Sequence, residues 1–363
     1  FHLAAESQSP ISAVRLYYWA EDERVRMRAD PFFEVATAVE AWHTWGLLPG
    51  DLAPGAQIHY FWRLETVDGG VLETEPASLV YADERFHWRE MSDGLLTLHW
   101  HDLSEGRARD YLQAAVEALD RLSIDVGLGL QQPVQVYLYN SVEEMGLVVP
   151  SRSEIYDEST LTLGMTLSDD TLVVLTDAYG VENTIAHELS HIVVGFATDN
   201  PLGGVPLWLD EGLAMYAEGD LASTNRRALE KAIRQDQLIS VRSLSAYTGN
   251  PDEVDLYYGE AYSVVAFLLE TYGQEELRAL LQAFHEGTAQ EKALRQVYGI
   301  GLEELDSTWR VHVGAAPHGG ASGLAEQNSD GATRAKESPT VFGEGLCAGT
   351  LLPPAWLLCF VLY

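Results

Sequence analysis

The residue periodicity changes once along this chain, near residue 180, and that change constrains the fold most strongly. Before it, apolar runs are short and rich in aromatic and β-branched residues, as in Ala13–Trp19, Gln57–Leu64 and Val134–Tyr139, a pattern typical of strands. From residue 181 to about residue 313, apolar residues recur mostly at helical spacing. Strands that come first and helices that come later indicate the α+β fold class.

Two folded units are expected, because 363 residues exceed the length of a typical single domain. Residues 1–88 predict a small β-sandwich-like N-terminal domain, in which the turn Asp68–Gly70 separates two strand-like pieces. Residues 92–315 predict a second domain that begins with a strand at Leu95–His101. The first helix of this domain carries apolar residues at helical spacing, namely Tyr111, Leu112, Ala115, Val116 and Leu119.

The chain from residue 316 onward differs in composition from both units. Residues 316–345 are rich in Gly, Ala, Ser and Glu, which predicts a flexible linker. Residues 346–363 carry no charged side chain, and their number is at the lower limit for a membrane span, although Pro353 and Pro354 interrupt the run. We expect a truncated transmembrane segment here, with a disordered tail as the alternative. Such an anchor would hold the preceding domains outside the cytoplasm, at the cell surface.

Charge and cysteine content exclude several classes of function. The chain has 55 acidic and 22 basic residues and a net charge of −33. Because nucleic-acid binding requires a basic surface, we expect no nucleic-acid partner. The acidity is typical of a soluble, self-repelling surface. Both cysteines, Cys347 and Cys359, lie near the end of the chain, so the two folded units contain neither a disulfide framework nor a cysteine-ligated zinc.

The segment His187–His191 has the sequence HELSH, which matches the zinc-binding pattern HExxH. Two histidines four residues apart lie on the same face of a helix, so both imidazoles can reach one ion. Glu188 lies next to the first histidine, where its carboxylate can take a proton from a zinc-activated water. The alternative interpretation is a pair of helix-surface histidines that flank an unrelated acid.

A catalytic zinc requires a third protein ligand, and the residues after the pattern narrow the choice. The metzincin arrangement would place a glycine at 194 and a histidine at 197, where this chain has Val194 and Ala197. That class is therefore excluded. About twenty residues further on, the segment Trp208–Ala214 reads WLDEGLA. Its glycine, Gly212, removes a side chain at a point where two helices would have to approach closely.

The HExxH pattern followed by WLDEGLA resembles the gluzincin zinc metallopeptidases, in particular the M1 aminopeptidase group and the bacterial peptidase MA-like proteins. The resemblance covers most of the two predicted domains. It implies a Zn²⁺ cofactor with His187, His191 and Glu211 as ligands, and Glu188 as the catalytic base. It also implies a thermolysin-like catalytic domain that hydrolyses peptide or protein substrates. For the third ligand, Asp210 or no residue at all remains the alternative.

The segment Tyr258–Ser263 reads YGEAYS and opens a further predicted helix. The resemblance implies a tyrosine in this region whose phenol donates to the oxyanion of the tetrahedral intermediate. Tyr258 matches that position best, with Tyr262 as its substitute. The alternative for either residue is core packing, because aromatic residues at helical spacing are common in cores.

A second pair of histidines, His99 and His101, lies in the strand predicted for Leu95–His101. Alternate residues of a strand share a face, so the two side chains could bind one ion. No third ligand is evident in the sequence, and we therefore expect a feature of the strand surface rather than a metal site.

The chain departs from the M1 aminopeptidases at one position of functional importance. Those enzymes carry a GxMEN segment before the zinc helix, whose glutamate holds the free amine of the substrate. Leu163–Leu167 reads LGMTL and contains neither Glu nor Asn. We therefore expect an endopeptidase whose edge strand near this segment binds extended peptide by β-augmentation. The alternative function is a surface binding or adhesion module with a vestigial or structural zinc site.

Overall fold

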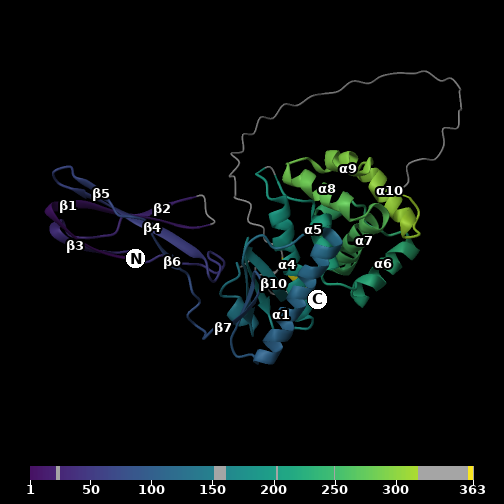
Figure 1. Cartoon of the computed structure of the whole chain (residues 1–363), viewed down its shortest axis with the longest axis horizontal. Coiled ribbons are helices and arrows are strands. Elements are labelled where there is room, and N and C mark those ends of the chain that lie inside the picture. The colour runs from purple at the N-terminus through teal and green to yellow at the C-terminus, as the bar shows by residue number, and fades with distance from the viewer. Residues whose placement is uncertain (22–24, 151–160, 202, 249, 318–358, 363) are drawn as a thin grey trace, which may run out of the picture.

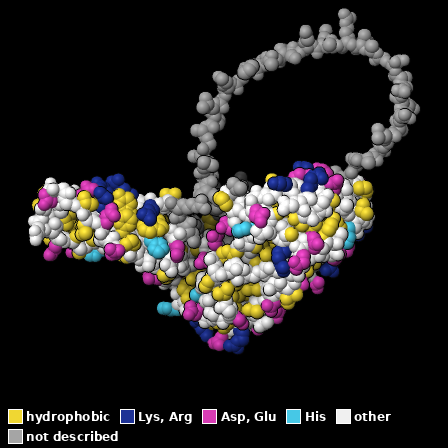
Figure 2. Space-filling model, turned by 45° about the horizontal axis from the view of Figure 1, so that its top comes forward, with side chains coloured by type: hydrophobic (Ala, Val, Ile, Leu, Met, Phe, Trp, Pro, Cys, Tyr) yellow, Lys and Arg dark blue, Asp and Glu magenta, His cyan; other side chains and the backbone are white. Residues whose placement is uncertain are grey.

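The computed structural model describes residues 1–21, 25–150, 161–201, 203–248, 250–317 and 359–362. The fold class is α+β, as the sequence predicts. A β-sheet domain made from the first part of the chain projects from a larger unit in which a second sheet is combined with helices (Figure 1). On the face shown in Figure 2, Asp and Glu side chains are spread over both parts.

β1 (His2–Ala20) is the central strand of the N-terminal domain, because it is long enough to pair with two neighbours at different points. β3 (Ala36–Trp42) pairs with its first half and β4 (Gln57–Thr66) with its second half, both antiparallel, and both registers shift near Ile11. Three shorter strands complete the sheet: β2 (Met27–Ala29), β5 (Val71–Glu73) and β6 (Ala77–Val80). Inward-facing residues of β1 and β4 form the core, among them Val14, Leu16, Tyr18, Trp62 and Leu64.

The second sheet has six strands in the order β12-β10-β11-β9-β8-β7. Three neighbours are parallel, namely β8 (Leu96–Trp100), β9 (Val134–Tyr139) and β11 (Thr171–Leu175). The others pair antiparallel, namely β7 (Arg89–Asp93), β10 (Leu161–Ser168) and β12 (Cys359–Leu362). Parallel pairing of β8 with β9 requires a crossover connection, and α1 (Glu105–Arg121) supplies it.

α4 (Val181–Thr198) is the central helix of the second unit, and it is buried along most of its length. It contacts α1 and β10 on one side and α5 (Leu207–Ala217) on another. The other long helices are α6 (Ser223–Gln235), α7 (Val254–Tyr272), α8 (Gln274–His285), α9 (Gln290–Tyr298) and α10 (Leu302–His312). The short elements are η1 (Leu122–Val126), α2 (Val142–Met145), η2 (Ser243–Ser245) and η3 (Pro251–Glu253).

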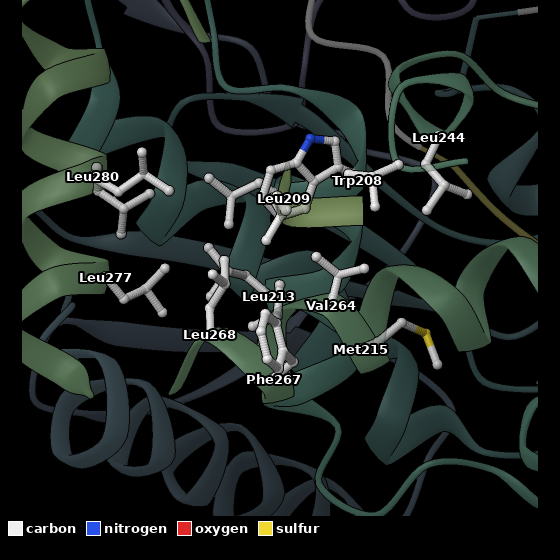
Figure 3. Close-up of a cluster of buried hydrophobic side chains, with 14 of the residues drawn as sticks. Trp208, Leu209, Leu213, Met215, Leu244, Val264, Phe267, Leu268, Leu277 and Leu280 are labelled. Atoms are coloured by element: carbon white, nitrogen blue, oxygen red, sulfur yellow. The ribbon is translucent and has the colours of Figure 1, made fainter. Parts of the chain in front are cut away.

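α5 and α7 pack closely at the centre of the helical core. A Cβ atom on Gly212 would lie 2.4 Å from the carbonyl oxygen of Ala261 and 2.5 Å from Cγ2 of Val265. Gly212 is therefore needed where these two helices meet, as the sequence predicts. Figure 3 shows the apolar side chains around this contact, including Trp208, Leu209 and Leu213 of α5, Val264, Phe267 and Leu268 of α7, and Leu277 and Leu280 of α8.

The predicted linker and transmembrane segment fall mostly outside the described residues, which omit 318–358 and 363. Residues 359–362 form β12, which pairs antiparallel with β10 and places Cys359 opposite Met165. Among the helices of the described residues, none combines the length and the apolar character that crossing a membrane requires.

Candidate active site

His187, Glu188 and His191 lie in the middle of α4, where the helix is completely enclosed. Their exposed fractions are 1%, 0% and 6%. Because His187 and His191 are four residues apart on a helix, their imidazoles project from one face, with ring centroids 4.8 Å apart. They are not the helix-surface histidines of the alternative interpretation.

Glu211, in α5, completes a group of three candidate ligands. Its Oε2 atom lies 3.3 Å from Nε2 of His187 and 3.9 Å from Nε2 of His191, and the three ligand atoms lie within 4.8 Å of one another. Two ligands of a tetrahedral zinc, each about 2.0–2.2 Å from the ion, are separated by about 3.4 Å. The residues present therefore fit a zinc ion.

The charge around this group also fits a cation. Glu188, Asp210, Glu211 and Glu218 are largely buried around the two imidazoles. None of the ion pairs formed by the described residues joins these four carboxylates to a lysine or arginine. Burial lowers the pKa of His187, but contacts with Glu211 and Glu218 outweigh this and raise it to about 10. The site thus favours positive charge, and buried carboxylates of this kind are paired or coordinate a metal.

Two of these carboxylates lie next to the other ring nitrogens of the imidazoles. Glu218 Oε1 lies 2.9 Å from Nδ1 of His187, and Asp210 Oδ1 lies 3.2 Å from Nδ1 of His191. A carboxylate on the second nitrogen fixes the tautomer and the orientation of a metal-binding histidine. Asp210 contacts the outer nitrogen of His191, so its position suits an orienting role better than that of the third ligand.

Glu188 lies between the candidate ligands and β10. Its Oε2 accepts a 3.0 Å hydrogen bond from Thr166 Oγ1, while Oε1 is buried with no hydrogen-bond partner among the described residues. Burial raises the pKa of Glu188, and the two imidazoles oppose that effect. A Cβ atom on Gly164 would lie 2.9 Å from Glu188 Cγ and 2.6 Å from Thr184 Cγ2. Gly164 therefore allows β10 to lie directly against the helix that carries the site.

Comparison with known proteins identifies the family. The sequence model of the Peptidase MA superfamily matches residues 114–315, which is more than half of the chain. The chain belongs to the Peptidase MA superfamily. The His187, His191 and Glu211 group agrees with this membership, and the chain is a zinc metallopeptidase of the gluzincin type. The binding or adhesion module considered above is not supported.

Several solved structures of M1 zinc metallopeptidases are similar to this Peptidase MA protein at low sequence identity. The enzyme from Deinococcus radiodurans is 13% identical, with 85% of each chain covered and a TM-score of 0.38. A mutant of that enzyme is 12% identical, with 85% and 86% covered and a TM-score of 0.41. The same mutant bound to a Tyr-Ser-Ala substrate is 14% identical, with 90% and 88% covered and a TM-score of 0.36. No curated protein sequence matches the peptidase.

The two tyrosines singled out in the sequence of the peptidase lie in different surroundings. Tyr258 is 8% exposed, and its ring lies beside the candidate ligands, with its centroid 6.2 Å from that of His187. Tyr262 instead stacks on Tyr216 at 6.2 Å, at the edge of the helical core. The structure therefore brings Tyr258, rather than its substitute, to the candidate zinc site.

The histidines of β8 and its end lie in separate polar and aromatic contacts. His99 stacks on Tyr137 and contacts Gln135 Oε1 at 2.7 Å. His101 is buried against Phe86, with ring centroids 4.0 Å apart. Among the described residues, only His187, His191 and Glu211 form a group of three or more side chains at ligand spacing. The prediction of a strand surface feature is wrong for His101, which is buried, whereas His99 is partly exposed.

Sequence reasoning missed one polar residue of this site, Tyr247, and the roles of Glu218 and Thr166. Tyr247 Oη donates a 2.6 Å hydrogen bond to Glu211 Oε1, and burial together with the Glu211 charge raises the pKa of this phenol, which keeps it protonated. Glu218 had a local signal, since residues seven apart lie on one face of a helix. Tyr247 and Thr166 had none, because tertiary packing alone brings them to their partners.

Proposed function

We propose that this zinc metallopeptidase is an endopeptidase whose zinc is held by His187, His191 and Glu211, with Glu188 as the catalytic base. We assign catalysis to a domain of residues 92–315, preceded by a β domain of residues 1–88. The observation that carries the proposal is the buried His-His-Glu group with a second buried carboxylate, that of Glu188, directly beside it. A His2Glu ligand set with one open position is typical of catalytic rather than structural zinc.

Zinc, when bound, polarises the scissile carbonyl and acidifies a water molecule. Glu188 takes a proton from that water on Oε1, the carboxylate oxygen that has no hydrogen-bond partner among the described residues. As the water oxygen bonds to the carbonyl carbon and the C–N bond breaks, Glu188 returns the proton to the leaving nitrogen. Thr166, which binds the other oxygen, keeps the carboxylate in place through these two transfers.

The phenol of Tyr258 supplies the remaining group of this mechanism. It donates a hydrogen bond to the substrate oxygen as negative charge develops there, which stabilises the transition state more than the ground state. The position of its ring beside His187 supports this role.

The outer edge of β10 supports binding of an extended peptide. Thr166 of β10 donates a hydrogen bond to Glu188, and a Cβ atom on Gly164 would meet the Glu188 side chain, so a chain paired with this strand passes next to the catalytic base. The same edge already pairs antiparallel with β12, which indicates that it accepts an extended partner and that a substrate has to displace this strand. Pairing through the main chain does not depend on a free terminus.

Within the described residues, the part of β10 that lies beside Glu188 offers no acid to hold a free substrate amine. Leu163–Leu167 contains no acid. Glu182, the acid nearest to the zinc-binding motif on its N-terminal side, is exposed in the first turn of α4. Its charge contributes to the raised pKa of Tyr111 in α1. Both observations favour cleavage within a peptide over removal of its first residue.

Digestion of matched peptides tests the proposed specificity. Peptides of identical sequence with free and with acetylated N-termini are incubated with the full chain, and the products are identified by mass spectrometry. We expect cleavage at the same internal bond and at similar rates in both. Stepwise shortening of only the free-amine peptides would show an aminopeptidase instead.

We also propose that the peptidase acts outside the cytoplasm and is held at a membrane by residues 346–363, in a state in which residues 359–362 do not pair with β10. The support is the complete absence of charge in that segment and the strongly acidic composition of the rest of the chain. Fractionation of cells that express the full gene tests this: the protein is expected in the membrane fraction, and a soluble cytoplasmic product would contradict it.

A further inference from the structure

Tyr247 is a partly exposed residue whose hydroxyl reaches the centre of the site. The residue is 48% exposed, whereas Glu211, to which its hydroxyl donates at 2.6 Å, is 1% exposed. Burial of the ring does not explain this arrangement, because almost half of the residue faces solvent. We propose that Tyr247 is a positioning residue that fixes Glu211 for zinc binding, an inference that rests on the ligand set proposed above.

The hydrogen bond from Tyr247 gives the two carboxylate oxygens of Glu211 different surroundings. Oε1 is occupied by the phenol, and the 2.6 Å distance is typical of a strong hydrogen bond from a hydroxyl to an ionised carboxylate. Oε2 faces His187 and His191 and has no hydrogen-bond partner in the described part of the chain. Tyr247 thereby selects Oε2 as the ligand atom and limits Glu211 to binding through one oxygen.

The loop that carries Tyr247 is anchored to the helical core by a buried side chain and by a hydrogen bond. Leu244 is fully buried, its carbonyl accepts a hydrogen bond from Tyr257 Oη at 3.2 Å, and η2 packs against α5. Figure 3 shows Leu244 together with Trp208 in the hydrophobic cluster. The ring of Tyr247 also packs on that of Tyr257, with centroids 5.9 Å apart.

Two hydrogen bonds hold the backbone at the start of this loop. Asp306 Oδ1 accepts from the backbone N–H of Val241 at 2.8 Å, and Glu260 Oε1 accepts from that of Ile239 at 3.0 Å. The phenol is therefore held next to Glu211 by a loop whose backbone is fixed by hydrogen bonds and packing, as positioning of a metal ligand requires.

Tyr247→Phe isolates the hydroxyl, because it keeps the ring and its packing. Tyr216→Phe is the matched control. Tyr216 lies on α5, the helix of Glu211, and its hydroxyl also donates to a carboxylate, Asp125 Oδ2 at 3.3 Å, which is not one of the candidate ligands. A general effect of losing a tyrosine–carboxylate hydrogen bond near this helix would affect both variants.

The test measures zinc dissociation constants of the full chain by competition with a chelator, together with the absorption spectrum of the cobalt-substituted protein. Loss of a group that orients a metal ligand typically weakens metal affinity by about 10–100-fold. We expect a loss of that size and an altered cobalt spectrum for Tyr247→Phe, and neither for Tyr216→Phe. Wild-type affinity and spectrum in Tyr247→Phe would overturn the inference.

A third variant, Glu211→Gln, separates this inference from the proposed function. If Glu211→Gln binds zinc as tightly as the wild type, the ligand assignment itself is wrong. If Glu211→Gln loses zinc while Tyr247→Phe retains wild-type affinity, the ligand assignment stands and only the role of Tyr247 is rejected.

Discussion

Gly212→Ala is expected to destabilise the helical core although alanine is the better helix former. The added Cβ would lie 2.4 Å from the carbonyl oxygen of Ala261, a backbone atom that cannot rotate away, and 2.5 Å from Val265 Cγ2. Overpacking of this kind costs about 1–3 kcal/mol, and replacing a helical glycine by alanine returns about 0.5–1 kcal/mol. Because the clash is with backbone, we expect a net loss of about 1–2 kcal/mol.

Gly195→Ala is the control for this prediction. Gly195 lies in α4, is exposed, and a Cβ atom there would meet nothing within 4 Å. This variant should gain about 0.5–1 kcal/mol through helix propensity alone. Urea unfolding followed by far-UV circular dichroism measures both. A Gly212→Ala protein as stable as the wild type would refute the argument that α5 and α7 meet through this glycine.

Two further predictions concern a buried acid and the C-terminal strand. Burial raises the pKa of Glu260 to about 8, so its contribution to stability is complete below its ordinary pKa and is lost as pH rises toward 8. Glu260→Gln, which can still accept the hydrogen bond from Ile239, should therefore flatten the decline of the unfolding free energy between pH 5 and 8 by up to about 4 kcal/mol. An unchanged slope in urea titrations at three pH values would contradict this. Because β12 occupies the edge of β10, removing residues 318–363 should lower the KM for peptides without lowering kcat, whereas an unchanged or higher KM would show that this strand does not compete with substrate.

The sequence predicted the parts of this molecule that depend on local geometry. The spacing of His187 and His191 predicts that both imidazoles lie on one face of a helix, and the structure shows this. The glycine at 212 predicts a close approach of two helices, which the structure also shows. The strand predicted at Ala13–Trp19 was too short, because β1 continues to His2 through a half-exposed segment, rich in small and polar residues, that pairs with β3. Such residues carry no apolar alternation from which a strand can be read.

The contacts that complete the site were not predictable in the same way. Thr166 lies 22 positions before Glu188, and Tyr247 lies 36 positions after Glu211. Each meets its partner only because a β-strand or an anchored loop packs on a helix. Serine, threonine and tyrosine residues at such positions look like ordinary surface or core residues in the sequence, and only the fold distinguishes them.

The measurement that tests the central claim most directly compares zinc content and peptide hydrolysis in one preparation of Glu188→Gln. A double variant of His187 and His191, each replaced by Ala, serves as the metal-free reference. Because Glu188 is placed as the base and not as a ligand, Glu188→Gln should retain about one zinc per chain. Its hydrolysis should fall by about 10²-fold or more, the scale expected for loss of a general base. Hydrolysis near the wild-type rate, or loss of zinc equal to that of the double variant, would contradict the account.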